Sequence, residues 1–108
     1  MRFLYPAVFT KEDSCYLVSF PDFDGYGTYG DDLTEAYEMA KELMEAVVSG
    51  SYVGNAGAVP APTDPMAIQA DKYSFISLVY SDFDPIACYT KGKKSAALDE
   101  REDDGAED

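Results

Sequence analysis

Apolar residues at helical spacing follow Asp32, and they set the main constraint on the fold. They recur every three or four positions as far as Val47, with acidic side chains at many of the positions between them. Asp32 and Glu35 have the spacing of a capping box, and Gly50 is placed to end the helix. A helix with a single apolar face packs on another element, and here that face comprises Leu33, Ala36, Tyr37, Ala40, Leu43, Met44 and Val47.

The segment before this helix predicts the sheet on which the helix packs. Residues 3–10 alternate as in a strand, residues 11–14 form a polar turn, and residues 15–20 return as the second strand of a hairpin. Turn-forming residues 21–25 then lead to a short third strand at residues 26–29. The period of two places Phe3, Tyr5, Ala7 and Phe9 on one face of the first strand, and Tyr16, Val18 and Phe20 on one face of the second.

Proline and glycine positions refine this scheme. Pro6 cannot donate a hydrogen bond to a neighbouring strand, so we expect the first strand to lie at a sheet edge or to be bulged there. Residues 51–71 carry three prolines and two glycines and predict a loop, whereas residues 73–80 return to strand character. Residues 82–90 predict one further short strand or a turn. The fold class is therefore α+β: an antiparallel three-stranded meander, then an amphipathic helix and one or more further strands.

The C-terminal residues differ in composition from the rest of the chain. From Lys91 onward Leu98 is the only large apolar residue, and residues 91–108 hold seven acidic and four basic side chains. Such a segment has too little apolar area to offset the entropy lost on ordering. We therefore expect one domain over residues 1–90, followed by an acidic disordered tail over residues 91–108.

The charge and the missing residue types exclude several function classes. The chain carries 21 acidic and eight basic residues, a net charge of −13, which opposes direct binding to nucleic acid and favours a basic protein partner. It contains no histidine, which is the usual general base and the commonest metal ligand. Cys15 and Cys88 lack the spacing of a metal site, and no apolar stretch approaches the roughly 20 residues of a membrane span. We expect a cytoplasmic protein without catalytic residues, metal or cofactor.

Carboxylates around a glycine-containing turn raise the alternative of a calcium site. Asp22, Asp24 and Gly25 have the form of a calcium loop, but an EF-hand requires a further ligand before the glycine. It also requires a glutamate six positions after the glycine, where this chain has Asp31. The spacing favours turn roles for Asp22 and Asp24, and a place for Asp31 at the positive end of the helix dipole.

Four short sequence elements follow one another along the chain: Tyr5-x-Ala7, Tyr16-x-Val18-x-Phe20-Pro21-Asp22, Thr28-x-Gly30-Asp31 and Glu35-Ala36-x-x-x-Ala40. In order and spacing they resemble the elements of the HicB antitoxin family. The proline-marked segment at residues 60–62 is similar to a loop that precedes the next strand in that family. The resemblance covers about residues 3–80.

The resemblance implies a partial RNase H-like domain that acts as the antitoxin of a type II toxin–antitoxin system. Such a protein neutralises a HicA-type toxin, an mRNA endonuclease, by masking it, and is not itself an enzyme. An RNase H-like two-metal site requires a carboxylate on the first strand, and residues 3–10 contain none. Family members commonly append a DNA-binding module, for which residues 91–108 are too short, so we expect a single-domain form without direct promoter binding.

Acidic side chains are the candidate contacts to a basic toxin, since opposite charges steer association. A homo-oligomer, such as a homodimer paired through an exposed strand edge, is also compatible with the sequence. The alternative function is that of an orphan, self-associating structural or regulatory domain without a toxin partner. The predicted partner-binding residues are Asp22, Asp24, Asp31, Glu35, Glu38, Glu42 and Glu45.

Overall fold

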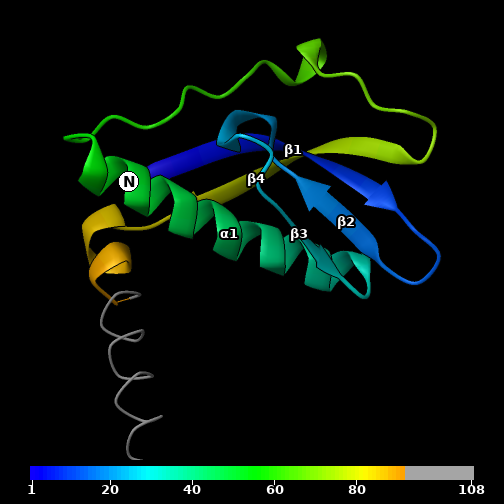
Figure 1. Cartoon of the computed structure of the whole chain (residues 1–108), viewed down its shortest axis with the longest axis horizontal. Coiled ribbons are helices and arrows are strands. Elements are labelled where there is room, and N and C mark those ends of the chain that lie inside the picture. The colour runs from blue at the N-terminus through cyan, green and yellow to red at the C-terminus, as the bar shows by residue number, and fades with distance from the viewer. Residues whose placement is uncertain (92–108) are drawn as a thin grey trace, which may run out of the picture.

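The chain folds into a sheet with one long helix packed on one of its faces (Figure 1). The computed structural model describes residues 1–91. Its four strands form an antiparallel sheet in the order β3-β2-β1-β4, and the predicted α+β class is confirmed. The elements are β1 (Arg2–Lys11), β2 (Tyr16–Ser19), the 3-10 turn η1 (Pro21–Phe23), β3 (Gly27–Gly30), α1 (Leu33–Gly54), the 3-10 turn η2 (Pro65–Ala67) and β4 (Ser74–Asp82).

The surroundings of Pro6 show how an inner strand accommodates a proline. β1 pairs with β4 over nearly its whole length, but it pairs with β2 only from Val8 to Lys11. Pro6 lies opposite Leu78 of β4 and beyond the end of β2, so its missing N–H leaves no gap in the β1–β2 ladder. The prediction that this strand lies at an edge or is bulged at Pro6 is therefore wrong, since its register with β4 runs unbroken through Pro6. Within residues 1–91, however, no strand pairs with Pro6 on the β2 side.

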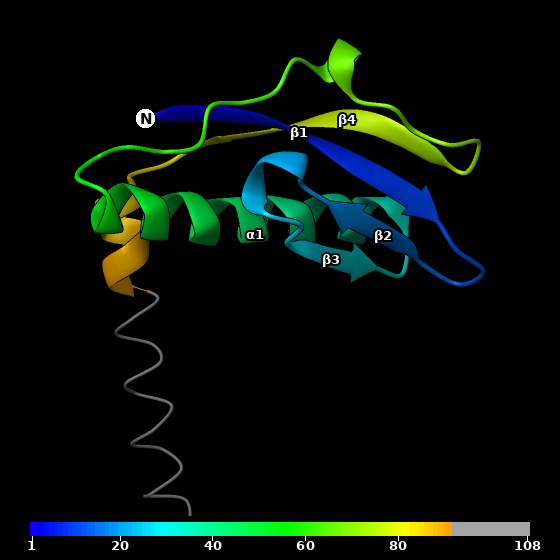
Figure 2. The same cartoon turned by 45° about the horizontal axis from the view of Figure 1, so that its top comes forward.

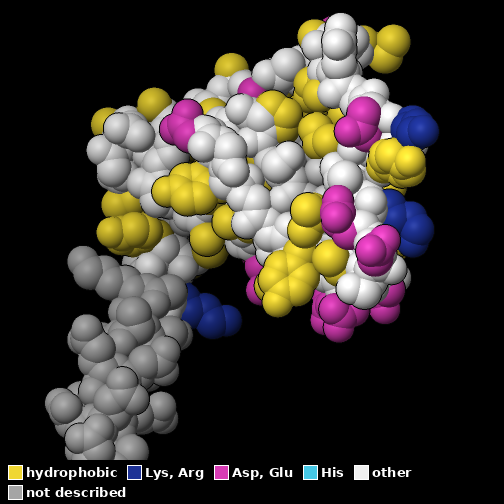
Figure 3. All heavy atoms as spheres, turned by 45° about the vertical axis from the view of Figure 1, so that its right-hand side comes forward, with side chains coloured by type: hydrophobic (Ala, Val, Ile, Leu, Met, Phe, Trp, Pro, Cys, Tyr) yellow, Lys and Arg dark blue, Asp and Glu magenta, His cyan; other side chains and the backbone are white. Residues whose placement is uncertain are grey.

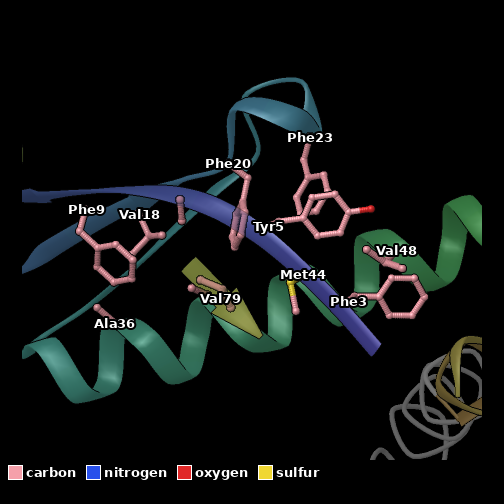
Figure 4. Close-up of a cluster of buried hydrophobic side chains, with 12 residues drawn as sticks. Phe3, Tyr5, Phe9, Val18, Phe20, Phe23, Ala36, Met44, Val48 and Val79 are labelled. Atoms are coloured by element: carbon pink, nitrogen blue, oxygen red, sulfur yellow. The ribbon is translucent and has the colours of Figure 1, made fainter. Parts of the chain in front are cut away.

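The hydrophobic core lies between α1 and the face of the sheet that the helix covers (Figure 4). All four β1 residues that the alternation placed on one face are buried in it, so this prediction is confirmed. Tyr5 and Phe23 pack with their ring centroids 4.8 Å apart, which brings η1 onto the core. The buried apolar residues are Phe3, Tyr5, Ala7, Phe9, Val18, Phe20, Phe23, Ala36, Ala40, Met44, Val48 and Val79, whereas Leu33, expected on the apolar face of the helix, is exposed.

The helix α1 begins with the predicted cap. The Asp32 carboxylate accepts a hydrogen bond of 2.8 Å from the amide of Glu35, as a capping box requires. The Glu35 carboxylate accepts in return from the amide of Asp31, at 2.6 Å, which is one residue earlier than the usual partner. Two of the amides that a helix start leaves without a partner are satisfied in this way.

The C-terminal end of α1 lies beyond Gly50, where the sequence rule had placed it. The helix continues to Gly54, because a glycine inside a helix costs only about 1 kcal/mol and Tyr52, in the added turn, is half-buried. The chain leaves the helix at Asn55, and Gly57 adopts the left-handed conformation, with a φ of 90°. The prediction that the helix ends at Gly50 is therefore wrong by four residues.

Gly30 allows the start of α1 to lie directly on the backbone of β3. A Cβ atom at this position would lie 2.3 Å from the amide nitrogen of Ala36 and 2.6 Å from its Cα atom. Because both neighbours are backbone atoms of the first helical turn, they cannot move aside without shifting the helix. Gly30 thus fixes the first turn of α1 beside the edge strand, next to Tyr29.

The segment after α1 forms a loop and returns as the edge strand β4. Residues 55–73 run along the side of β1 and β4 that lies away from α1 (Figure 2). The strand predicted at residues 73–80 is confirmed as β4, with its ends shifted by one or two residues. Among the described residues, no helix combines the length and the hydropathy that crossing a membrane would require.

The end of the described chain is helical over residues 85–91, so the expected strand or turn over residues 82–90 is wrong. The Asp84 carboxylate accepts from the amide of Ile86 at 3.0 Å, and Pro85 follows Asp84 at a position that suits the first turn of a helix. The predicted disordered tail concerns residues 91–108. Of these, residues 92–108 lie outside the described part of the chain.

Candidate partner-binding surface

Asp22 ties the loop after α1 to the turn after β2. Its two carboxylate oxygens accept from the amide and the hydroxyl of Thr63, and the bond from the amide is 3.0 Å long. Asp22 is half-buried in this arrangement and has a structural role. Asp24 is exposed and has a left-handed backbone, with a φ of 52°, which agrees with the predicted turn role.

Asp31 and Glu35 lie together at the start of α1. Both are exposed, and the bond from the amide of Asp31 to the carboxylate of Glu35 holds the two residues side by side. The position of Asp31 at the positive end of the helix dipole agrees with the sequence-based interpretation. These two carboxylates form a local negative charge beside Tyr29 of β3.

The other predicted glutamates lie farther along α1 and are not equivalent. Glu38 and Glu42 are exposed on the helix side away from the sheet. Glu45 is half-buried, and its carboxylate accepts a hydrogen bond of 2.5 Å from the hydroxyl of Ser81 on β4. Glu45 therefore joins the helix to the sheet.

The structure separates the predicted acidic residues into different places instead of one patch. Asp22 and Glu45 make internal contacts, Asp24 lies in a turn, and Glu38 and Glu42 face solvent. Within residues 1–91, no group of three His, Cys, Asp or Glu side chains is arranged to hold a metal ion. The calcium-loop arrangement is not formed, since both oxygens of Asp22 are directed at Thr63.

The sheet face opposite α1, here called the outer face, is a surface that the sequence reasoning missed. It carries the strand residues that alternate with the core residues. Two of them, Arg2 and Asp82, are charged and are paired at one end of the β1–β4 ladder. The others are uncharged, although residues 1–90 contain 14 acidic side chains and four basic ones. The outer-face residues are Arg2, Leu4, Pro6, Val8 and Thr10 of β1, Leu17 and Ser19 of β2, Gly27 and Tyr29 of β3, and Ser74, Ile76, Leu78, Tyr80 and Asp82 of β4.

The sequence did carry a signal for this surface. Leu4 and Val8 alternate with the core residues of β1, so the strand is apolar on both sides. Strands with two apolar faces are typical of sheets that are covered on both sides. In this protein α1 covers one face. The other face is covered only in part, since Pro6 is buried there but Leu4 is 45% exposed.

A groove of about 450 Å³ lies on the outer face where β1, β2 and β3 meet. Ser19 and Gly27 are paired across the β2–β3 ladder, and their small size leaves the hollow. The next outward pair, Leu17 and Tyr29, is 44% and 61% exposed and forms a wall of this outer groove. The complete lining consists of Val8, Thr10, Leu17, Val18, Ser19, Gly27, Thr28 and Tyr29.

A second hollow, of about 220 Å³, adjoins the outer groove at Tyr29 and is here called the acidic hollow. Asp31, Glu35 and Met39 complete its lining. Met39 falls outside the apolar stripe of the helix and is 38% exposed. Acidic and hydrophobic side chains lie next to one another at the end of the molecule where α1 starts (Figure 3). Tyr29 thus connects an uncharged groove with a negatively charged hollow.

Comparison with known proteins supports the resemblance found in the sequence. No protein-family model and no curated protein matches the chain. A chain of a toxin–antitoxin complex from Streptococcus pneumoniae is similar in structure, with a TM-score of 0.66 and 29% sequence identity, covering 76% of this chain and 70% of that chain. A chain of the HicA3 and HicB3 toxin–antitoxin complex shares the fold, with a TM-score of 0.56 and 24% identity, covering 77% of this chain and 100% of that chain. The resemblance to the HicB family is thereby confirmed.

Proposed function

We propose that this chain is the antitoxin of a type II toxin–antitoxin pair and neutralises a HicA-type mRNA endonuclease by binding and covering it. The observation that carries the proposal is the structural similarity to a chain of the Streptococcus pneumoniae complex. The HicB-like sequence elements are a second line of evidence for the same proposal. They coincide with β1, β2, β3 and the start of α1, the elements that build the outer groove and the acidic hollow.

The charge of the folded part supports a basic protein as the partner. Residues 1–90 hold 14 acidic and four basic side chains, a net charge of −10. A toxin that binds RNA needs positive charge at its RNA-binding surface, because phosphate contacts supply most of the non-specific affinity for nucleic acid. An acidic protein competes with RNA for such a surface and reaches it quickly through electrostatic steering.

The proposed mechanism is masking, without a chemical step by this chain. The fold is taken as a partial RNase H-like domain, but β1 carries no carboxylate with which to build the two-metal site of that fold. Asp22 and Glu45, two of the carboxylates nearest to the core, are engaged with Thr63 and Ser81. Inhibition of the toxin would follow from steric exclusion of RNA by the bound antitoxin.

Co-expression tests this function. The toxin candidate is any short reading frame next to this gene that encodes a basic protein, and it is induced from one plasmid while the chain is induced from another. We expect the toxin alone to arrest growth and the chain to restore it at comparable expression. A frameshifted copy of the gene is the control. It is transcribed but does not yield the protein, so it shows whether the transcript alone could restore growth. Arrest that persists in the presence of the intact chain would contradict the proposal.

A further inference from the structure

We propose that the outer groove binds an apolar segment of a basic partner protein, and that the acidic hollow receives a lysine or arginine of the same segment. This inference rests on the proposed function, since it takes the toxin as the partner. It adds the surface through which the two proteins meet. The sequence-based expectation had placed that contact on a row of acidic residues, of which only Asp31 and Glu35 line the acidic hollow.

The distribution of charge identifies the outer face as an interface. Apart from the pair Arg2 and Asp82 at one end of the β1–β4 ladder, its strand residues are uncharged, in a domain where acidic side chains are numerous on the other surfaces. Depletion of charge at the centre with charge at the rim is the usual composition of a protein–protein interface. Exposed apolar patches with a polar rim also mark interaction sites.

Tyr29 is the residue on which the two hollows meet. It lines both of them and is 61% exposed, and Leu17 is its partner in the β2–β3 ladder. Tyrosine is enriched among the interface residues that contribute most to affinity, because its ring buries a large area and its hydroxyl can form a hydrogen bond. A partner segment in the outer groove would therefore pack against Tyr29.

The acidic hollow defines the chemistry of the side chain that enters it. Asp31 and Glu35 supply two carboxylates, and Met39 supplies an apolar wall. Lysine and arginine have a long apolar stem that packs on apolar surface and a cationic end that pairs with carboxylates. This combination accounts for an exposed methionine beside two acids on a helix whose other apolar residues mostly face the core.

Charge also distinguishes a basic partner from a second copy of this chain. Two copies that met through the outer groove would each bring a net charge of −10, and their acidic hollows would lie at the rim of the same interface. Like charges placed together in this way oppose association by several kcal/mol. A basic partner gains from the same charges, so it is the occupant that the structure favours.

The test measures binding of the full chain to the toxin that it neutralises, prepared in a catalytically inactive form. Tyr29→Ala removes the central ring, and Tyr73→Ala is the matched control, because Tyr73 is also 61% exposed and lies outside both hollows. We expect Tyr29→Ala to weaken binding at least about tenfold and Tyr73→Ala to change it less than about twofold. Leu17→Ser is a second variant for the groove, and circular dichroism verifies that each variant is folded.

A second pair of variants tests the acidic hollow. Glu35→Gln removes a charge but keeps an oxygen that can accept from the amide of Asp31, so the helix cap is retained. Glu38→Gln removes the same charge outside the hollow. We expect Glu35→Gln to speed dissociation at least about threefold and Glu38→Gln to leave the dissociation rate unchanged, because a charge in direct contact acts mainly on dissociation.

The outcomes separate this inference from the proposed function. A toxin that binds the unaltered chain and both groove variants equally would overturn the inference and leave the antitoxin role intact. Failure of the unaltered chain to bind or neutralise any toxin would contradict the function and, with it, the inference. Sedimentation of the protein alone addresses self-association, because a dimer that Tyr29→Ala converts to a monomer would assign the groove to a second copy.

Discussion

The hydroxyl of Ser81 on β4 donates a hydrogen bond of 2.5 Å to the Glu45 carboxylate on α1. This contact joins the middle of the helix to the edge strand, which lies at the opposite side of the sheet from β3, where Gly30 fixes the helix start. The helix is thus held across the sheet at two places. Of the glutamates on the helix, Glu45 therefore contributes to the fold, whereas Glu38 and Glu42 remain in solvent.

Loss of this contact should destabilise the protein. We expect Ser81→Ala to lower the free energy of unfolding by about 1–2 kcal/mol, because it leaves the half-buried carboxylate of Glu45 without its donor. The exposed Ser19 provides the control, and Ser19→Ala should stay within about 0.5 kcal/mol of the unaltered protein. Chemical denaturation measures both values. Equal effects of the two substitutions would show that the Ser81–Glu45 contact contributes nothing to stability.

Alanine substitutions at two glycines, Gly30 and Gly50, should change the stability of the protein in opposite directions. Gly30→Ala forces a carbon into contact with the backbone of Ala36 and should cost about 3 kcal/mol or more. Gly50→Ala places its methyl group in open space inside α1 and should stabilise the protein by about 0.5–1 kcal/mol through its higher helix propensity. Urea unfolding curves compare the two. Similar stability of both variants would contradict the close approach of α1 to β3.

The pH dependence of stability should depend on Tyr5. Burial, assisted by the charge of Asp22, raises the pKa of Tyr5 above its ordinary value of 10.0, and its hydroxyl donates to the carbonyl of Pro60 at 2.5 Å. A raised pKa in the folded state means that the stabilisation is complete below about pH 10 and is lost as the pH rises from there through the folded-state pKa.

Tyr5→Phe isolates this contribution. The variant should be less stable than the unaltered protein at neutral pH, because it leaves the Pro60 carbonyl without its donor. The difference between the two proteins should shrink above about pH 10. Melting temperatures measured between pH 8 and about pH 11 test this expectation. A constant difference over that range would be inconsistent with a raised pKa of Tyr5.

Asp22 should control the mobility of the loop after α1. Asp22→Asn retains one acceptor oxygen in place of two, so one of the bonds to Thr63 is lost. We expect thermolysin to cleave residues 55–73 about fivefold faster in this variant, which corresponds to about 1 kcal/mol in the opening equilibrium. Asp24→Asn is the control, since Asp24 is exposed and asparagine also tolerates its left-handed backbone. Identical cleavage rates would refute the anchoring role.

Local sequence rules predicted the parts of this fold that depend on local chemistry. The alternation of β1 and the capping box at Asp32 and Glu35 are both confirmed, because side-chain period and cap geometry act over a few residues. The position of β1 inside the sheet depends on where β2 ends, and the continuation of the helix past Gly50 depends on the surroundings of the added turn, where Tyr52 is half-buried. Those are tertiary effects, so the proline and glycine rules gave the wrong answer there.

The candidate site was predicted less well than the fold. The acidic residues were selected by charge alone, and the hydrogen bonds of Asp22 to Thr63 and of Glu45 to Ser81 join residues too far apart in the sequence to be predicted from it. The outer groove was missed because its shape arises from Ser19 and Gly27 being paired across two strands. That pairing is fixed by the register of β2 and β3, which the composition of each strand does not specify.

Association with the toxin should depend on salt. The net charge of −10 over residues 1–90 attracts a basic partner, and ions screen such attraction over about 8 to 10 Å at physiological ionic strength. We expect the association rate in stopped-flow mixing to fall steeply as salt rises and the dissociation rate to change little. Association that is equally fast at low and high salt would exclude electrostatic steering.

Cleavage of a defined mRNA by the purified toxin, titrated with this chain, tests the central claim most directly. The masking mechanism predicts that cleavage falls in proportion to added chain and stops near a stoichiometric amount, and that the chain alone cleaves no RNA with or without divalent metal ions. RNA cleavage by the toxin that continues at its full rate in an excess of folded chain would contradict the account.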